Sequence, residues 1–272
     1  MLVSELKSCS AQLLDKFKNS YGLNGYKLPT DKDSYHKYQP LRYLENDIKN
    51  GEITFVYPNV WEDPYEKRFY NKDYRKLNFF APEICCLCLT TKQAQNEYAM
   101  WKVYSQPNEY IVRAQIKIAD LLSALDRIAS EYHFKVYIGE VIYAEKKYIN
   151  GITPATQPYF PTTNNNNFSI ENYLTLMLLK RISYQYENEV RIFIVFEDKH
   201  GENSQNETIY KVSIGTNPPI ISSILLPPYK TSTLTDKVLS EGERSRKKLI
   251  EHELNVTVKQ SRLYSPCKKI II

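Results

Sequence analysis

The sequence predicts a single α+β domain with a mixed, mostly antiparallel or split central β-sheet flanked by helices. Three observations predict it: segments of strand pattern outnumber segments of helical pattern, the two kinds alternate unevenly, and 42% of the 272 residues are hydrophobic. Uneven alternation is not typical of the regular strand–helix units of a doubly wound parallel sheet. The hydrophobic content is enough for one large core or two modest ones. We expect residues 1–34 to form a helix and a polar lead-in, and residues 35–272 to form the domain.

The charge and cysteine content narrow the class of protein. The net charge of +5 comes from 36 basic and 31 acidic residues, and so mild an excess does not by itself indicate a nucleic-acid partner. Among the five cysteines, Cys85, Cys86 and Cys88 lie inside an apolar run, with no second cluster to complete a metal site. The sequence shows no secretory leader and no apolar span of ~18 residues. We therefore expect a cytoplasmic protein with reduced cysteines, no metal and no membrane partner.

Capping residues mark the elements of the first third of the chain. Pro40 suits the first turn of a helix, and Gly51 suits the left-handed position after its last turn. Asp63 before Pro64 is expected to cap a turn or a short helix. The elements expected here are a helix over Ser4–Asn19, a strand over Tyr35–Tyr38, a helix from Pro40 to Asn50 and a strand over Ile53–Tyr57.

Periodicity gives the remaining elements. The stretch Asn150–Phe168 is rich in Asn, Thr and Pro and is expected to be a surface loop, because it has no apolar face to bury. Helices are expected over Gln93–Ser105, Asp120–Tyr132, Ser169–Ile182 and Thr233–Glu253. Strands are expected over Ile84–Leu89, Tyr110–Ile118, Thr208–Ile214, Ile220–Leu226 and Asn255–Lys259, with a strand pair within Phe134–Ala144 and a late strand over Ile192–Phe196.

The entrance to that late strand is the first candidate for chemistry. If the strand begins near Glu187, its period of two places Glu187, Glu189 and Arg191 on one face, with ~7 Å between next-but-one side chains. Three charges at the start of a buried strand are costly unless something pairs or uses them. The alternative is a structural one, in which Glu189 and Arg191 only pair with neighbours at a solvated strand end.

Four segments, in this order and spacing, resemble the motifs of the bacterial family called domain of unknown function 2971. They are Lys37-Tyr38 before a helix, Trp61-Glu62-Asp63-Pro64-Tyr65-Glu66, Cys88-Leu89-Thr90 followed by Ala99-Met100-Trp101-Lys102-Val103-Tyr104, and Tyr186-Glu187-Asn188-Glu189-Val190-Arg191. The resemblance extends to about Pro228. The chain departs from the family at Trp61-Glu62, at Val190 and at Asn108-Glu109, where the family often has a glycine after the helix.

The order of these parts also resembles, more remotely, the split-sheet fold of ADP-ribosyltransferases. That resemblance implies NAD as a substrate, with the ribose held from the first strand, nicotinamide held between aromatic rings, and a late-strand glutamate stabilising an oxocarbenium-like transition state. Carried onto this chain, it implies Glu189 as the catalytic carboxylate, with Glu187 orienting the nucleophile or the ribose. The implied NAD-binding residues are His36, Tyr38, Trp61, Asp63, Tyr65, Trp101, Tyr104 and Arg191.

Three functions from different classes remain open at this point. The first is an NAD-consuming ADP-ribosyltransferase or NAD glycohydrolase, acting as a toxin or in antiviral defence, with a protein or nucleic acid as acceptor. It requires His36, Trp61, Tyr65, Trp101 and Glu189 to meet in one cleft. The second is a non-catalytic ligand- or protein-binding module of a defence system, in which Glu189 is locked against a base and faces no cavity. The third is a nucleic-acid-binding or processing protein that uses the basic run Arg244–Lys248.

These functional readings compete with plainly structural ones. A strand histidine such as His36 is most often structural, and Trp101 and Tyr104 at helical spacing are most often core residues. Asp63 is as compatible with the structural cap of a turn as with a residue of a functional loop. Cys85, Cys86 and Cys88 are expected to be small buried hydrophobic residues, and the Arg244–Lys248 run a solvated helix face.

Overall fold

The structure, a computed structural model, describes residues 35–70, 82–91, 97–104, 109–151, 170–200, 207–216, 219–228 and 247–261. Several expectations lie outside these residues. They are the lead-in over 1–34 with its helix Ser4–Asn19, the loop expected over Asn150–Phe168 apart from its first two residues, and most of the helix expected over Thr233–Glu253. No helix in the described part of the chain is long and apolar enough to cross a membrane.

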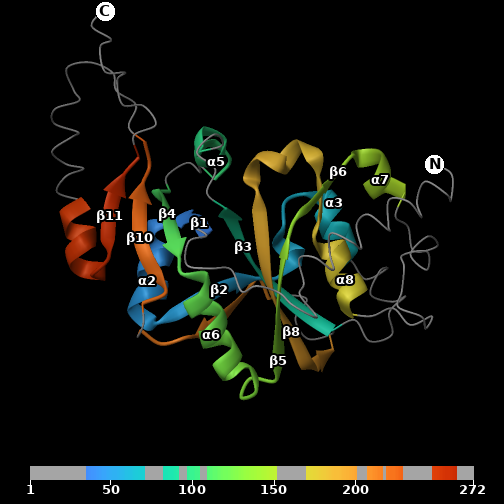
Figure 1. The fold of residues 1–272 in the computed structure, drawn as a ribbon, viewed down its shortest axis with the longest axis horizontal. Coiled ribbons are helices and arrows are strands. Elements are labelled where there is room, and N and C mark those ends of the chain that lie inside the picture. Colours follow the sequence, from blue (N-terminus) through green and yellow to red (C-terminus); the bar gives the residue numbers. More distant parts are fainter. Residues whose placement is uncertain are drawn as a thin grey trace, which may run out of the picture.

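A mixed, mostly antiparallel sheet forms the centre of the fold (Figure 1). Its path runs β11-β10-β4-β1-β3-β2-β9, with β8 paired to β3 and β5 paired to β8. Among the described strands of this sheet, only β10 and β11 pair in parallel. Its strands are β1 (Tyr35–Pro40), β2 (Glu52–Val56), β3 (Pro82–Thr91), β4 (Ile111–Ile116), β5 (Phe134–Glu140), β8 (Glu189–His200), β9 (Ile209–Ser213), β10 (Ile221–Leu226) and β11 (Thr257–Gln260).

The sheet splits at β3. Thr90 pairs with Glu189 of β8 on one edge of β3 and with His36 of β1 on the other. Further along the same strand, Cys86 pairs with Phe193 of β8 and with Val56 of β2. Strands β1 and β2 therefore share one edge of β3 at different heights, and they diverge from each other beyond it.

Helices and a small second sheet surround the split sheet. Helix α2 joins the two diverging strands, beginning after Pro40 and ending at Gly51, whose φ of 63° is left-handed. The helices are α2 (Leu41–Asn50), α3 (Pro64–Lys67), α5 (Glu97–Val103), α6 (Ile118–Ala129), α7 (Lys146–Gly151), α8 (Ile170–Met177) and a last one over 247–254, with 3-10 turns η1 (Pro58–Val60), η2 (Arg68–Tyr70) and η5 (Ile182–Glu187). The second sheet is the parallel pair β6 (Ile142–Ala144) and β7 (Leu179–Arg181).

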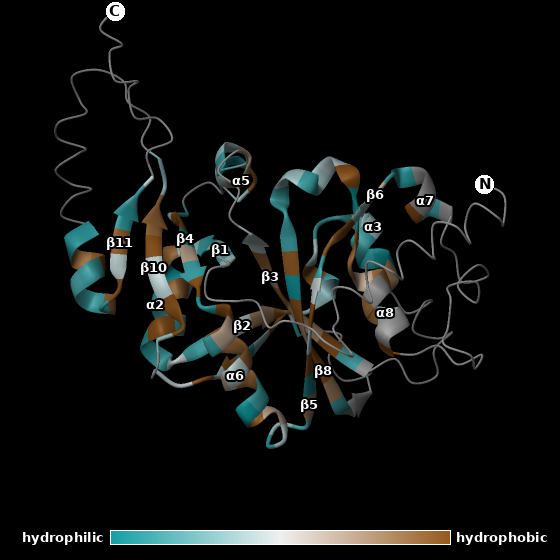
Figure 2. Ribbon diagram, viewed as in Figure 1, coloured by the Kyte–Doolittle hydropathy of each residue, from teal (hydrophilic) through white to brown (hydrophobic). Residues whose placement is uncertain are grey.

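Alternating residues of β3 and β8 face two different hydrophobic cores. Ile192 and Ile194 pack in the larger core with α2, α6 and the last helix, whereas Phe193 and Val195 pack in a second core with α8. Period-two alternation thus continues through a strand that is apolar on both faces, as expected where both faces are covered. Figure 2 shows apolar residues concentrated along these central strands. Glu189 and Arg191 follow the alternation onto the face of the second core.

The predicted fold class is confirmed, since the chain forms an α+β fold with a mostly antiparallel, split sheet. One helix prediction was wrong in extent: the apolar run expected as a helix over Ser169–Ile182 is helical only to Met177 and continues as β7. The late strand begins at Glu189, and Glu187 lies in η5 before it. The two strands within Phe134–Ala144 exist, but β5 pairs with β8 and β6 with β7.

Candidate active site

The strand register places three polar side chains in one row across the sheet. His36 on β1 pairs with Thr90 on β3, and Thr90 pairs on its other edge with Glu189 on β8. Directly paired residues point to the same face, and two strand spacings amount to ~10 Å. The first-strand histidine and the late-strand glutamate are therefore close neighbours on one face of the sheet.

Glu189 is held through both of its carboxylate oxygens. Its Oε1 accepts a hydrogen bond from Arg191 Nε at 2.7 Å, and its Oε2 accepts one from Arg191 Nη2 at 3.0 Å. This is the two-pronged geometry in which a guanidinium and a carboxylate pair most strongly. Lys180 Nζ also donates to Oε2, at 2.9 Å. Glu189 is 6% exposed and Arg191 1%, so both charges are almost fully withdrawn from water.

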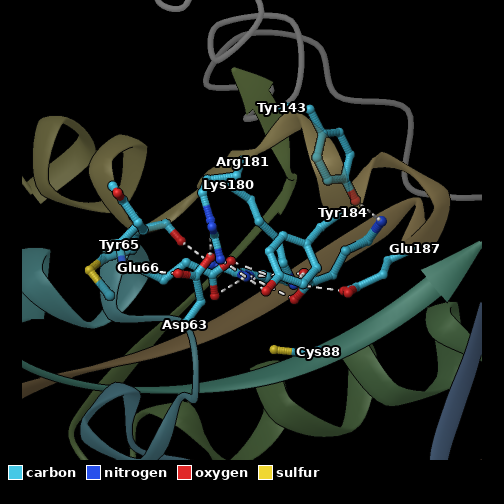
Figure 3. A network of polar contacts seen from close by, with 12 residues as sticks. Asp63, Tyr65, Glu66, Cys88, Tyr143, Lys180, Arg181, Tyr184 and Glu187 are labelled. Atoms are coloured by element: carbon cyan, nitrogen blue, oxygen red, sulfur yellow. Dashed lines mark hydrogen bonds and ion pairs between the residues drawn. The ribbon is translucent and has the colours of Figure 1, made fainter. Parts of the chain in front are cut away.

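Lys180 and Arg191 connect two further carboxylates to this pair. Lys180 Nζ donates to Glu187 Oε2 at 2.6 Å, and Arg191 Nη2 donates to Glu66 Oε2 at 3.1 Å. The second oxygen of Glu66, Oε1, lies 3.5 Å from Lys180 Nζ. We call these five residues, Glu66, Lys180, Glu187, Glu189 and Arg191, the charge network; Figure 3 shows it from close by.

Glu187 and Glu189 have opposite pKa shifts. Burial by itself raises the pKa of Glu189, but the charges of Arg191 and Lys180 outweigh it and lower that pKa to about 2. For Glu187 burial is the larger effect, and it raises the pKa to about 6 although Lys180 opposes it. Glu189 is consequently a fixed negative charge near neutral pH, whereas Glu187 exchanges a proton close to it.

A left-handed turn directs Glu187 toward Lys180. The turn η5 ends at Asn188, whose φ of 45° and ψ of 54° are left-handed, a conformation that asparagine tolerates better than most residues. Thr90 Oγ1 donates to the carbonyl oxygen of Glu187, and the backbone N–H of Thr91 donates to that of Asn188 at 3.0 Å. Both hydrogen bonds fasten the turn to β3, so Glu187 and Glu189 reach one cation from different elements.

A cavity of about 140 Å³ lies against the carboxylate side of the charge network. We call it the first cavity. The residues that matter most in its lining are His36, Tyr38, Cys88, Tyr104, Glu187 and Glu189. Five residues predicted for a site, His36, Tyr38, Tyr104, Glu187 and Glu189, therefore meet around one space from three distant segments of the chain.

The aromatic wall of the first cavity is a stack. The rings of Tyr38 and Tyr104 lie 5.5 Å apart between centroids with an interplanar angle of 18°, and Trp101 packs edge-on against Tyr38 at 5.0 Å. Burial raises the pKa of Tyr104, and the nearby charges of Glu187 and Glu189 raise it further, so its hydroxyl remains protonated. Because the two tyrosines stack on each other, they offer an outer ring face to the cavity and leave no slot between them.

Five predicted residues are not among the described residues that line the first cavity: Trp61, Asp63, Tyr65, Trp101 and Arg191. The Trp61 ring lies 4.2 Å from Arg191 Cζ and covers its guanidinium. Asp63 caps α3 by accepting from the backbone N–H of Tyr65, and it also accepts from Arg181 Nε at 3.1 Å. The structure thus brings His36 and Glu189 into one cavity but does not bring Trp61, Tyr65 and Trp101 into its lining.

Sequence reasoning missed four members of the site. Lys180 falls near the end of the helix expected over Ser169–Ile182, and Glu66 falls in the motif Trp61–Glu66 with no role predicted for it, yet both belong to the charge network. The thiol of Cys88 lines the cavity and contributes a hydrogen bond that lowers the pKa of Glu189. The Tyr143 hydroxyl accepts from the backbone N–H of Glu189 at 2.9 Å. Lys180-Arg181 after six apolar or hydroxyl residues was the available signal, because two successive cations rarely continue a buried helix.

Two further predictions concern the basic run Arg244–Lys248 and metal binding. Of the basic run Arg244–Lys248 only the last two residues are described, and Lys247 Nζ lies 3.8 Å from Glu251 Oε1 on its own helix. Within the described residues, no group of three or more His, Cys, Asp or Glu side chains is placed to hold a metal ion.

Comparison with known proteins adds nothing to these observations: no protein-family model, curated protein or solved structure matches the chain. The resemblances to the family called domain of unknown function 2971 and to ADP-ribosyltransferases therefore remain predictions.

Proposed function

We propose that this protein cleaves the nicotinamide–ribose bond of NAD in the first cavity, as an ADP-ribosyltransferase or NAD glycohydrolase. The observation that carries the proposal is the joint lining of one small space by the Tyr38–Tyr104 stack, His36, Glu187 and Glu189. A cavity of about 140 Å³ holds one six-membered ring, since an apolar cavity of ~150 Å³ accepts benzene. Nicotinamide is a ring of this size, and the rest of the dinucleotide would lie outside the cavity.

The charge balance favours the transition state of this reaction. With every group ionised, the charge network holds three carboxylates against two cations and so has a net charge of −1. When the C1′–N bond breaks, its electron pair leaves with nicotinamide and positive charge develops on the ribose, until water or an acceptor attacks C1′. A fixed negative charge in a site with little water stabilises that developing charge, by ~3 kcal/mol for one well-placed group.

The structure suggests different tasks for the two carboxylates. Glu189 is immobilised by Arg191 and Lys180 and has a pKa of about 2, which suits a permanent electrostatic role. Glu187 has a pKa of about 6, which suits a group that accepts a proton from the nucleophile or from a ribose hydroxyl. In the proposed reaction Glu189 stabilises the sugar cation and Glu187 acts as the base.

The direct test is to incubate the purified protein with NAD and follow nicotinamide release by chromatography, with and without cell lysate as a source of acceptors. The proposal expects release by the parent protein and a loss of about 10²-fold in Glu187→Gln, the scale of removing one catalytic base. Glu140→Gln, an exposed carboxylate at the end of β5, is the matched control. Absence of nicotinamide release by the parent in both conditions would overturn the proposal.

One observation favours a second candidate, a binding module without catalysis. Both oxygens of Glu189 already accept hydrogen bonds from Arg191, so the carboxylate is less available to accept one from a ribose hydroxyl. In that case calorimetry would detect NAD binding that Tyr104→Ala weakens, while no nicotinamide is released. Either role fits a protein of a toxin or antiviral defence system, in which NAD is consumed or sensed.

A further inference from the structure

A second cavity, of about 390 Å³, lies among α2, the start of β2, the residues before β10 and the end of the last helix. Lys37 contributes to the lining of both cavities, whereas the next residues of β1 divide between them by alternation: Tyr38 lines the first and Gln39 the second. The volume falls in the range of pockets that bind small molecules, about 300–1,000 Å³.

Gln39 is the polar side chain that requires an explanation there. It is 8% exposed and lines the second cavity, and within the described part of the chain its amide makes no hydrogen bond. Its amide atoms are not fully enclosed by the protein, so they remain open to the cavity, where a polar group can pair with them. An amide at the wall of a cavity of this size is available to hydrogen-bond a polar group of a ligand.

The walls around Gln39 indicate the rest of the ligand. They are mainly aliphatic, from side chains that include Leu44, Ile53, Ile116, Ile220 and Leu254. The described lining contains neither an aromatic ring, on which a base would stack, nor an arginine, which would pair with a phosphate. These walls favour a compact aliphatic group.

Five charged residues line the described part of the second cavity; Lys49 and Glu253 are exposed to solvent, and the other three are already engaged with the protein. Lys37 Nζ donates to the carbonyl oxygen of Thr54 at 3.2 Å, and Asp47 Oδ1 accepts from Thr54 Oγ1 at 2.7 Å. Glu52 Oε2 pairs with Lys211 Nζ at 3.0 Å. A charged ligand would have to compete for these groups, whereas a neutral one leaves them in place.

We infer that the second cavity binds a neutral, mainly aliphatic small molecule whose amide or lactam group pairs with the Gln39 amide. Such a group both donates and accepts, so it can pair with the donor and the acceptor of the Gln39 amide at once. This inference rests on the second cavity alone and does not depend on NAD cleavage in the first.

The test uses N-cyclohexylacetamide, a neutral amide with an aliphatic ring, as the probe of the ¹⁵N-labelled full chain. Titration followed by NMR is expected to show saturable shifts of the Gln39 side-chain amide signals, which Gln39→Leu identifies by their loss. The charged analogues cyclohexanecarboxylate and cyclohexylammonium are expected to bind at least about 10-fold more weakly, the scale of one unpaired buried polar group.

Variants locate the binding. Gln39→Leu is expected to weaken the probe by about 10-fold, the scale of one lost hydrogen bond to a buried amide. The matched control Gln115→Leu, on β4, removes an amide that accepts from Ser223 and is expected to bind the probe as the parent does. Binding of a charged analogue as tightly as the amide, equal affinity in Gln39→Leu, or no saturable shift of the Gln39 signals in the parent would each overturn the inference. The last of these is measured without any variant.

Discussion

Glu66, Glu187 and Glu189 share two cations, Lys180 and Arg191, in a space almost closed to water. A network designed only for stability would balance its charges or replace them with apolar side chains, because the desolvation of buried ions is rarely recovered in full. The excess carboxylate instead maintains a negative potential at the first cavity. This potential is costly to hold and faces a space that a ligand can enter, which indicates a functional and not only a structural role.

Glu189→Gln should lower the free energy of unfolding markedly. The change leaves Arg191, 1% exposed, with Glu66 as its remaining carboxylate partner in the charge network, and breaking a buried ion pair costs up to about 3–5 kcal/mol. Urea denaturation at neutral pH measures the effect, and Glu140→Gln, an exposed carboxylate, should leave the midpoint where it is. A Glu189→Gln protein as stable as the parent would contradict the pairing. A Glu189→Gln protein that is destabilised yet still releases nicotinamide at the parent's rate would show that Glu189 has no role in catalysis.

Glu187→Gln should change the pH dependence of stability. The pKa of Glu187 is raised in the folded protein, from 4.5 to about 6, so its ionisation costs stability: the contribution is complete below pH 4.5 and is lost as pH rises through 6. The variant lacks this loss. The difference in unfolding free energy, variant minus parent, should therefore grow by about 2 kcal/mol between pH 4 and pH 7, at 1.36 kcal/mol for each pKa unit. Urea unfolding across this range checks it, and a difference that stays constant would place the pKa of Glu187 at its ordinary value.

At the scale of elements, β3 determines where the site lies. It pairs with β8 on one edge and with both β1 and β2 on the other, so it brings His36, Cys88 and Glu189 together from three strands. The turn η5 adds Glu187, and the short strand β7 adds Lys180. These last two elements lie outside the main sheet, and each delivers one side chain to the charge network.

Much of this arrangement was predictable from local sequence. Pro40 and Gly51 marked the ends of α2, Asp63 caps α3 as expected, and the alternation from Glu189 onward placed Arg191 on the correct face. The end of α8 at Met177 was not predictable, because an apolar run does not distinguish a buried helix from a buried strand. Lys180 was missed for the same reason. The cavity was beyond prediction too, since it depends on β1 and β2 sharing one edge of β3.

The glycine that ends α2 allows a matched test of backbone geometry. Gly51 and Gly215 both have left-handed φ angles, of 63° and 80°, but an added Cβ would lie 2.9 Å from the Gly215 backbone at position 51 and would meet nothing within 4 Å at position 215. Gly215→Ala should therefore cost only the left-handed conformation, about 1–2 kcal/mol, whereas Gly51→Ala should cost clearly more. Thermal unfolding of the two variants measures the difference. Equal losses would mean that the close approach of these two segments is easily relaxed.

At the scale of the whole molecule, the split sheet separates two cavities that share one wall. The first lies beside the charge network, and the second lies among α2, β2 and the last helix. Lys37 stands between them and spans the gap from β1 to β2 through its hydrogen bond to the Thr54 carbonyl. Burial lowers the pKa of Lys37, and Asp47 opposes that change, so the lysine is held in place at some cost. Because Lys37 lines both cavities, a ligand that moves this side chain in one cavity also changes the shape of the other.

Lys37→Met should consequently disturb both cavities at once. Methionine fills a similar volume but donates no hydrogen bond, so the Thr54 carbonyl loses its donor and Asp47 loses its neighbouring cation. We expect about 10-fold weaker binding of N-cyclohexylacetamide in the second cavity, the scale of one hydrogen bond to a charged group, together with weaker binding of NAD in the first. Calorimetry with each ligand measures the two affinities. Lys135→Met, an exposed lysine on β5 paired with Glu197, is the matched control and should leave both affinities unchanged. An effect of Lys37→Met on one ligand alone would mean that the two cavities are neighbours without a shared wall, and that the split in the sheet serves only one of them.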